Sequence, residues 1–140
     1  MAMQGLLSTR RPRRGGGFTL IELMVVLALI SVLAGMGVVQ YRNSVQRTRE
    51  AVLKEDLFRM RDAIDQYYAD KTKYPASLET LVNDGYLRQI PKDPITESSE
   101  TWQTVFAEPD PSNPTAEPGI VDVKSGAEGK SLDGSPYNEW

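Results

Sequence analysis

An uninterrupted apolar run near the N-terminus constrains this chain more than any other feature. Phe18 to Val39 reads FTLIELMVVLALISVLAGMGVV, and Glu22 is its only charged residue. A helix of about 20 apolar residues spans the roughly 30 Å hydrocarbon core of a bilayer. The run therefore predicts a transmembrane helix that carries one carboxylate close to its start.

The segment before this run predicts its orientation. Residues 1–17 contain no acidic residue, end in three glycines, and carry four arginines, Arg10, Arg11, Arg13 and Arg14. Positive charge beside a span stays on the cytoplasmic side of the membrane. We therefore expect a cytoplasmic N-terminus and an exported remainder.

A secretory signal peptide is the alternative interpretation of the same segment. Its apolar stretch is shorter, about 7 to 15 residues, and small residues at a cleavage site follow it. Ala34, Gly35 and Gly37 offer only a weak site of that kind. The length of the run favours an anchor.

Composition excludes several classes of function. The chain has no cysteine and no histidine, so disulfides, Ser-His-Asp or Cys-His catalysis and the common zinc sites are excluded. Of its 16 basic residues, four lie in residues 1–17, which leaves 12 against 19 acidic ones. An acidic surface does not suit phosphate contacts, so we expect no nucleic-acid partner. No nucleotide-binding GxxxxGK[ST] motif occurs, and we expect no enzyme.

Apolar residues continue beyond the run at helical spacing. Those that recur in steps of three and four are Leu53, Leu57, Met60, Ile64 and Tyr67 or Tyr68. This period marks one face of a helix. We expect one long helix from Phe18 to about Tyr68, with Gly35 and Gly37 as its weak point.

The remaining residues predict a small mixed domain. Tyr74-Pro75 breaks the helix, Ser77 to Val82 forms a second short one with Ser77 as its N-cap, and Asn83-Asp84-Gly85 stops it. Strands are predicted at Thr101 to Phe106 and Ile120 to Val123, with a proline-rich loop at Glu108 to Gly119 between them. The tail from Lys124 is ordered only if something ties it down.

The predicted fold class is α+β. A long N-terminal helix packs its second half on a short helix, a small antiparallel sheet and a structured C-terminal loop. We divide the chain into a leader at 1–17, a membrane helix at 18–39 and a globular domain at 40–140.

The residues Gly16-Gly17-Phe18-Thr19-Leu20-Ile21-Glu22-Leu23 resemble the class III signal of type IV pilins and pseudopilins. The resemblance implies that prepilin peptidase cleaves between Gly17 and Phe18 and methylates the new amine of Phe18. Glycine suits such a site because it lets an extended leader enter an active site.

Glu22 is the predicted assembly residue. An ionisable group inside a span costs several kcal/mol and usually faces a partner. The resemblance implies that the partner is the Phe18 amine of a neighbouring copy. Because a buried charge pair adds little net stability but penalises misaligned alternatives, we expect it to set the axial offset between copies. The alternative is a glutamate close enough to the interface to stay hydrated.

Later segments resemble the major pseudopilins of type II secretion. They are Tyr74-Pro75, Gly85-Tyr86-Leu87, Ile90-Pro91-Lys92-Asp93-Pro94 and the end from Gly126 to Trp140. The resemblance implies a filament of identical subunits that drives export across the outer membrane. It also implies minor pseudopilins, an assembly platform and an ATPase as partners, an inner-membrane location and a periplasmic filament.

Two departures from the family stand out. Val39 occupies a position where pilins commonly have proline. The family loop also commonly holds calcium; the matching position here is Glu128, with Asp133 as the nearest second carboxylate and Ser131 and Ser135 nearby. Because Ca²⁺ takes six to eight oxygens, this is a thin ligand set, and burial of Tyr137 and Trp140 is the alternative way to hold the tail.

Two other functions share the same anchor. An adhesion or motility pilin often has a C-terminal disulfide, which this chain lacks. A simple membrane-anchored periplasmic binding domain would keep its leader uncut.

Overall fold

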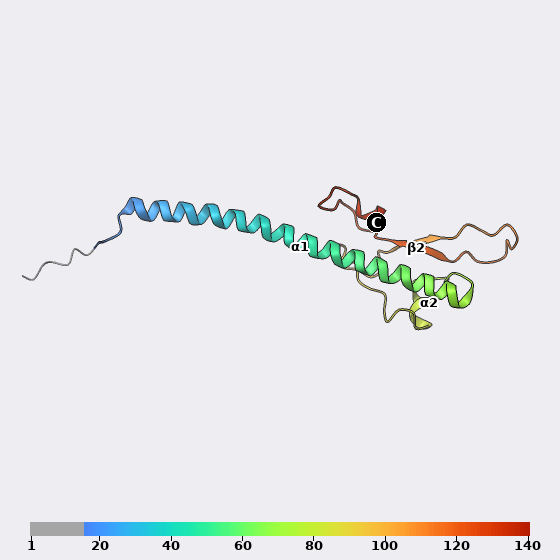
Figure 1. Cartoon of the computed structure of the whole chain (residues 1–140). Coiled ribbons are helices and arrows are strands. Elements are labelled where there is room, and N and C mark those ends of the chain that lie inside the picture. The colour runs from blue at the N-terminus through green and yellow to red at the C-terminus, as the bar shows by residue number, and fades with distance from the viewer. Residues whose placement is uncertain (1–15) are drawn as a thin grey trace, which may run out of the picture. The chain divides into compact units, whose positions relative to one another are not determined.

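The computed structural model describes residues 16–140, so the predicted leader lies outside the described residues except for Gly16 and Gly17. Its elements are helix α1 (Leu20–Lys71), helix α2 (Leu78–Asn83), strand β1 (Gln103–Phe106), strand β2 (Ile120–Lys124) and a closing 3-10 turn at Tyr137–Glu139 (Figure 1). This content confirms the predicted α+β fold.

Helix α1 is continuous over 52 residues and passes through Gly35 and Gly37 without a break. The chain divides into two compact units at the junction of Val39 and Gln40, so each half of α1 belongs to its own unit.

The start and the end of α1 follow from local chemistry. The helix begins at Leu20, two residues later than predicted, because the Thr19 hydroxyl accepts the backbone N–H of Glu22 at 3.2 Å and so acts as an N-cap. It ends at Lys71, and Thr72 then takes a left-handed backbone (φ 57°), which no helix can continue through.

The core of the second unit forms on the predicted face of α1. The buried α1 residues are Leu53, Leu57, Met60, Ala63, Ile64 and Tyr67. They pack in one cluster with Leu78, Leu81, Trp102, Ile120, Val123, Ala127 and Tyr137. Burial of this apolar surface is the main source of the domain's stability.

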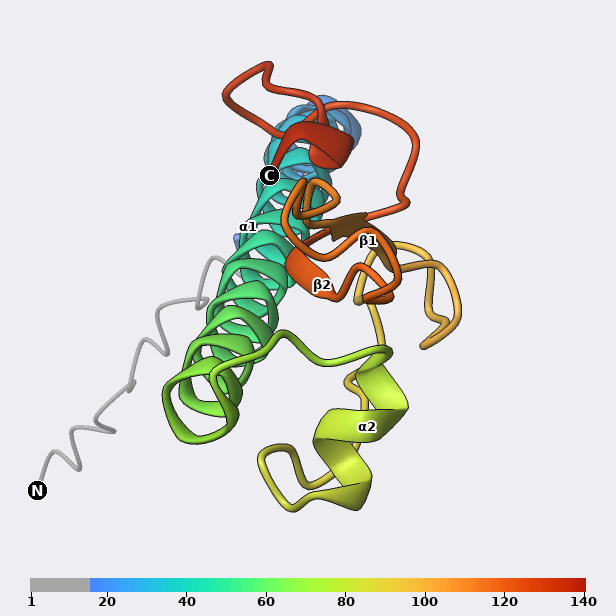
Figure 2. The ribbon, with the colours of Figure 1, turned by 90° about the vertical axis from the view of Figure 1, so that its right-hand side faces the viewer.

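Three segments of the domain contact this half of α1, at successive positions along it (Figures 1 and 2). The C-terminal loop is tied to Glu50, where Tyr137 donates a hydrogen bond. The strands come next, through an ion pair of 2.7 Å between Arg61 and Asp122. Near the end of α1, the segment after α2 is fastened by Tyr86, whose hydroxyl donates to Asp70 at 2.8 Å.

The predicted short helix and the predicted pair of strands are both present in the domain. Ser77 caps α2 by accepting the Thr80 N–H, as its sequence position predicts. Strands β1 and β2 pair antiparallel, with a register shift between Val105 and Phe106. Residues 102–105 alternate between less and more exposed side chains, and this alternation ends at the shift, where Phe106 is 52% exposed.

One buried carboxylate organises the turn after α2. Asp93 is fully buried, accepts the Ser125 hydroxyl on one oxygen, and accepts the N–H groups of Ile95 and Thr96 on the other. Gly126 follows Ser125, and a Cβ there would lie 1.9 Å from the Thr101 carbonyl oxygen. Only glycine fits so close to another backbone.

Candidate functional site

The predicted cleavage site is open. Gly16, Gly17 and Phe18 lie outside any helix, directly before α1, and Phe18 is 85% exposed. No atom approaches the position of a Cβ at Gly17. An exposed peptide bond at Gly17–Phe18, outside any helix, is therefore accessible to a processing enzyme.

The first half of α1 has no buried side. Every residue from Gly16 to Gln40 is exposed, and apolar side chains point outward in all directions. Within residues 16–140, α1 is the one helix long and apolar enough to cross a membrane. A helix that is apolar all round needs lipid or other helices as its surroundings.

Glu22 lies in the first turn of α1 and is exposed. Its carboxylate makes no hydrogen bond or ion pair to any residue in the described part of the chain; the printed contact at this position is the backbone N–H to Thr19. A carboxylate on an otherwise apolar helix surface therefore has its charge available to a group from outside the chain.

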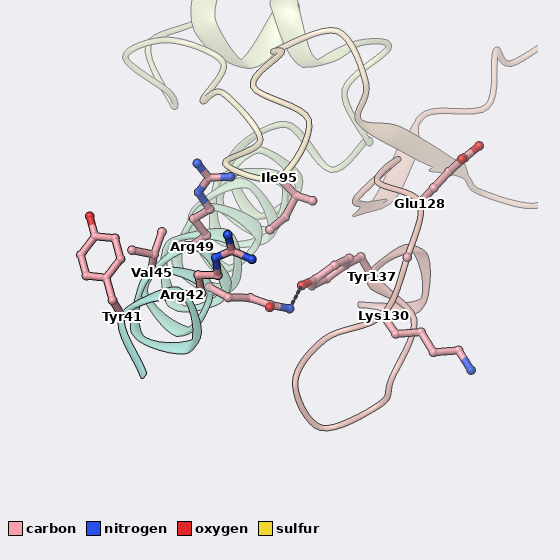
Figure 3. A pocket seen from close by; sticks show the side chains of 10 residues that line it. Tyr41, Arg42, Val45, Arg49, Ile95, Glu128, Lys130 and Tyr137 are labelled. Atoms are coloured by element: carbon pink, nitrogen blue, oxygen red, sulfur yellow. Dashed lines mark hydrogen bonds between the residues drawn. The ribbon is translucent and has the colours of Figure 1, made fainter. Parts of the chain in front are cut away.

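In the second unit, a surface groove of about 470 Å³ lies between α1 and the C-terminal loop (Figure 3). Tyr41, Arg42 and Arg49 line it from the helix, and Tyr137 lines it from the loop. The Gln46 amide donates to the Tyr137 hydroxyl at 3.1 Å across its floor.

Glu50 is the fastening point of the C-terminal loop, and nothing in the sequence pattern singled it out. One of its oxygens accepts hydrogen bonds from the Tyr137 hydroxyl (2.8 Å), the Leu132 N–H (2.9 Å) and the Gln46 amide (3.1 Å). Its partners in the loop lie 82 and 87 residues away. No local signal reports such a contact.

The two aromatic residues of the tail also hold it. Tyr137 is buried, and its ring meets Trp140 edge to face at 5.3 Å. Lys54 places its ammonium 4.5 Å from the centre of a Trp140 ring. Burial of the tail aromatics, the alternative to a bound cation, is therefore present.

The two calcium candidates are not brought together. Glu128 is exposed, lines the groove of Figure 3 and points away from α1, whereas Asp133 lines a different hollow beside Lys54 and Trp140. Among residues 16–140 no group of three acidic side chains is placed to share a metal ion.

Asp133 is instead satisfied by its own loop. One oxygen accepts the hydroxyls of Ser131 and Ser135 and the Ser135 N–H. These hydrogen bonds, that of Ser131 first, hold the pKa of this exposed carboxyl well below its usual range. The loop thus folds around the single carboxylate of Asp133.

Comparison with known proteins places these features in a family. A family model described as the prokaryotic N-terminal methylation motif matches residues 12–38. Type II secretion system core protein G of Pseudomonas aeruginosa is 35% identical over 98 residues, which cover 59% of this chain and 69% of that protein. The protein of the same name from Klebsiella pneumoniae is 31% identical over 98 residues, or 59% and 70% of the two chains.

A third relative extends the similarity over most of the chain. Type II secretion system core protein G of Vibrio cholerae is 26% identical over 150 aligned positions, which cover 94% of this chain and 95% of that protein. No solved structure gives a significant match. The motif, the exposed apolar helix and these relatives agree, and the chain belongs to the family of type II secretion system core protein G, the major pseudopilins.

Proposed function

We propose that the chain is the structural subunit of a type II secretion pseudopilus and polymerises through the first half of α1. The observation that carries this function is the fully exposed apolar surface from Leu20 to Val39, interrupted by one carboxylate. Before assembly that surface has lipid as its solvent, and afterwards it has other copies. Assembly is thus an exchange of lipid contacts for helix packing.

Processing precedes assembly in this proposal. Prepilin peptidase cuts between Gly17 and Phe18 and methylates the new amine of Phe18. The exposure of this bond and the methylation motif over residues 12–38 support that step. Cleavage also creates the cation that assembly requires.

Glu22 then pairs with the Phe18 amine of the neighbouring copy. Support comes from its position in the first turn of α1, a few residues from the new terminus, and from its free carboxylate. A misplaced neighbour leaves a charge unpaired in an apolar core, which costs several kcal/mol. The pair therefore selects one axial offset among many that apolar packing alone permits.

The location of the subunit and the partners of the filament follow from the membrane helix and the charges beside it. Arg10, Arg11, Arg13 and Arg14 keep the N-terminus in the cytoplasm, so residues 40–140 face the periplasm while the subunit sits in the inner membrane. The chain has no nucleotide-binding motif, so an ATPase and an assembly platform supply the work of extraction. Minor pseudopilins are the further partners we propose.

The two other functions with the same anchor are less well supported. The relatives that match the chain are named for secretion, which favours a secretion filament over a surface pilus. An anchored binding domain gives no role to a cleavage motif.

We propose that the C-terminal loop folds without bound calcium. Ca²⁺ takes six to eight oxygens, and the residues present do not fit that need, since Glu128 and Asp133 line different hollows and Asp133 is engaged by serine groups. Excess chelator should leave the unfolding temperature of the full chain unchanged, and added calcium should not raise it. A rise of several degrees with calcium would assign the ion a structural role.

Mass spectrometry of the protein from cells with a complete secretion system tests the proposed function. We expect a mature chain that starts at N-methylated Phe18 and is recovered in filaments. An intact Met1, with no filaments, would support the anchored binding domain.

A further inference from the structure

The outward side of the second half of α1 carries an ordered stripe of exposed residues. These are Arg47, Ala51, Phe58, Asp65 and Ala69. They follow one another in steps of three to four residues or multiples of them, so they share one side of the helix. The buried residues Leu57, Met60 and Ile64 occupy the opposite side, where the domain packs.

The two charged residues of this stripe, Arg47 and Asp65, differ from several other charges on α1. Arg59 pairs with Glu55 at 2.9 Å, and Arg61 pairs with Asp122 at 2.7 Å. Arg47 and Asp65 form no ion pair or side-chain hydrogen bond with any residue between 16 and 140. Each is free to meet a charge on another molecule.

An exposed aromatic ring lies between them. Phe58 is 66% exposed, whereas its α1 neighbours Leu57 and Met60 are buried in the folded unit. A single exposed apolar side chain is ordinary on a protein surface, so Phe58 matters here through its place between the two charges.

The residues of the stripe are spaced so that two copies can align when one is displaced by five helical turns. Arg47 and Asp65 are 18 residues apart, as are Ala51 and Ala69. At 3.6 residues per turn, 18 residues make five full turns and about 27 Å, so each pair lies on the same side of the helix. A displacement of one copy by five turns brings a cation level with an anion and alanine level with alanine.

The same displacement brings Phe58 close to the end of the other copy's apolar run. Eighteen residues before it lies Gln40, one residue past the end of the apolar run at Val39. In a displaced pair of copies, the ring is therefore level with the end of the other copy's apolar run. Alignment without displacement places Arg47 beside Arg47 and Asp65 beside Asp65, which like charges disfavour.

Copies in a pseudopilus are parallel, because each enters from the same membrane by the same end. A helical filament turns the same side of every copy toward its axis. We propose that the stripe from Arg47 to Ala69 faces the filament axis. There Arg47 of one copy pairs with Asp65 of a second copy displaced by five helical turns. This inference rests on the proposed function and adds a contact in the folded unit to the one at Glu22.

Engineered cysteines can test this displacement directly, because the natural chain has none. Ala51→Cys and Ala69→Cys introduce small side chains and keep both charges. In filaments of the full chain carrying both substitutions, mild oxidation should produce a ladder of disulfide-linked multimers. Each single variant should stay monomeric on a denaturing gel. A variant with Ala51→Cys and Ala76→Cys, the latter an exposed alanine beyond α1, is the matched control and should give no ladder.

Two results would overturn the inference. One is a normal filament of the double variant with no ladder, and the other is dimerisation of Ala51→Cys alone, which signals unshifted copies. If the unsubstituted chain forms no filament, the proposed function fails instead.

Charge exchange provides a second test that needs no cross-link. Arg47→Glu and Asp65→Arg should each reduce filament yield, and the two together should restore it. Arg88→Glu, an exposed cation off α1, should leave the yield unchanged. An exchanged pair no better than either single variant would contradict the pairing.

Discussion

The two halves of α1 are one continuous helix in two different surroundings. From Leu20 to Val39 apolar residues cover the whole circumference and none is buried. From Gln40 to Lys71 the buried apolar residues lie on one side, where Leu53, Met60 and Ile64 are fully buried, while Phe58 stays exposed on the other. The comparison shows that helix formation is common to both halves, whereas the distribution of apolar residues decides what each half contacts.

This difference also separates the consequences of a substitution. A change in the first half alters contacts that form only in a membrane or a filament. A change on the inward side of the second half alters the folded state of a single copy.

The largest effect is expected from Glu22→Val in the first half. The substitution makes the run fully apolar, so insertion into the membrane should be unimpaired. Filament assembly should be abolished, because the Phe18 amine of each neighbour then lacks its counter-ion. Electron microscopy and membrane fractionation measure the two properties, and normal filaments would refute the pairing role.

A core substitution in the second half comes next. Ile64 is fully buried, so Ile64→Ala should lower the free energy of unfolding by about 2 to 5 kcal/mol. Ile30, 56% exposed in the first half, is the matched control, and Ile30→Ala should leave thermal unfolding in detergent unchanged. Equal destabilisation by both variants would contradict the division between the halves.

A smaller effect is expected where the second half fastens the C-terminal loop. Glu50→Ala leaves the Tyr137 hydroxyl and the Leu132 N–H without their acceptor, at a cost of about 1 to 3 kcal/mol. Amide hydrogen exchange at Leu132 should accelerate. Glu55→Ala, which removes an exposed pair with Arg59, should cost only about 0.3 to 0.5 kcal/mol. Similar effects of the two would show that Glu50 is not the fastening point.

The smallest effect is expected near the C-terminal end of α1, where Tyr86 donates a hydrogen bond to Asp70. The hydrogen bond to Asp70 raises the pKa of the Tyr86 phenol from 10.0 to about 12. Because the pKa is higher in the folded state, the associated stability is complete below pH 10 and is lost as the pH rises through about 12. Ultraviolet titration of the wild type against Tyr86→Phe isolates this phenol. A Tyr86 transition near pH 10 would contradict the contact.

The elements of the fold were predictable where their signals are local. Steps of three and four residues predicted the buried side of α1, and Ser77 predicted the start of α2, since both depend on neighbours within one or two turns. The signal for Thr19 as the cap of α1 is equally local, since Thr19 and Glu22 form a Thr-x-x-Glu pattern.

Contacts between distant segments were not predictable. Glu50 reaches Leu132 across 82 residues, and Asp93 reaches Ser125 across 32. Either carboxylate, seen in the sequence, resembles an ordinary surface charge, because its burial and its partners exist only after the chain folds. The same reasoning explains Glu128 and Asp133, whose closeness in sequence did not place them in one hollow.

The fully exposed apolar surface of the first half of α1 bears on how subunits enter and leave a filament. Neither lipid nor neighbouring helices require this segment to change its fold, so a subunit can enter the polymer and return from it intact. Under the proposed function, the membrane is then a two-dimensional store, in which growth and shrinkage of the filament draw on the same pool of subunits.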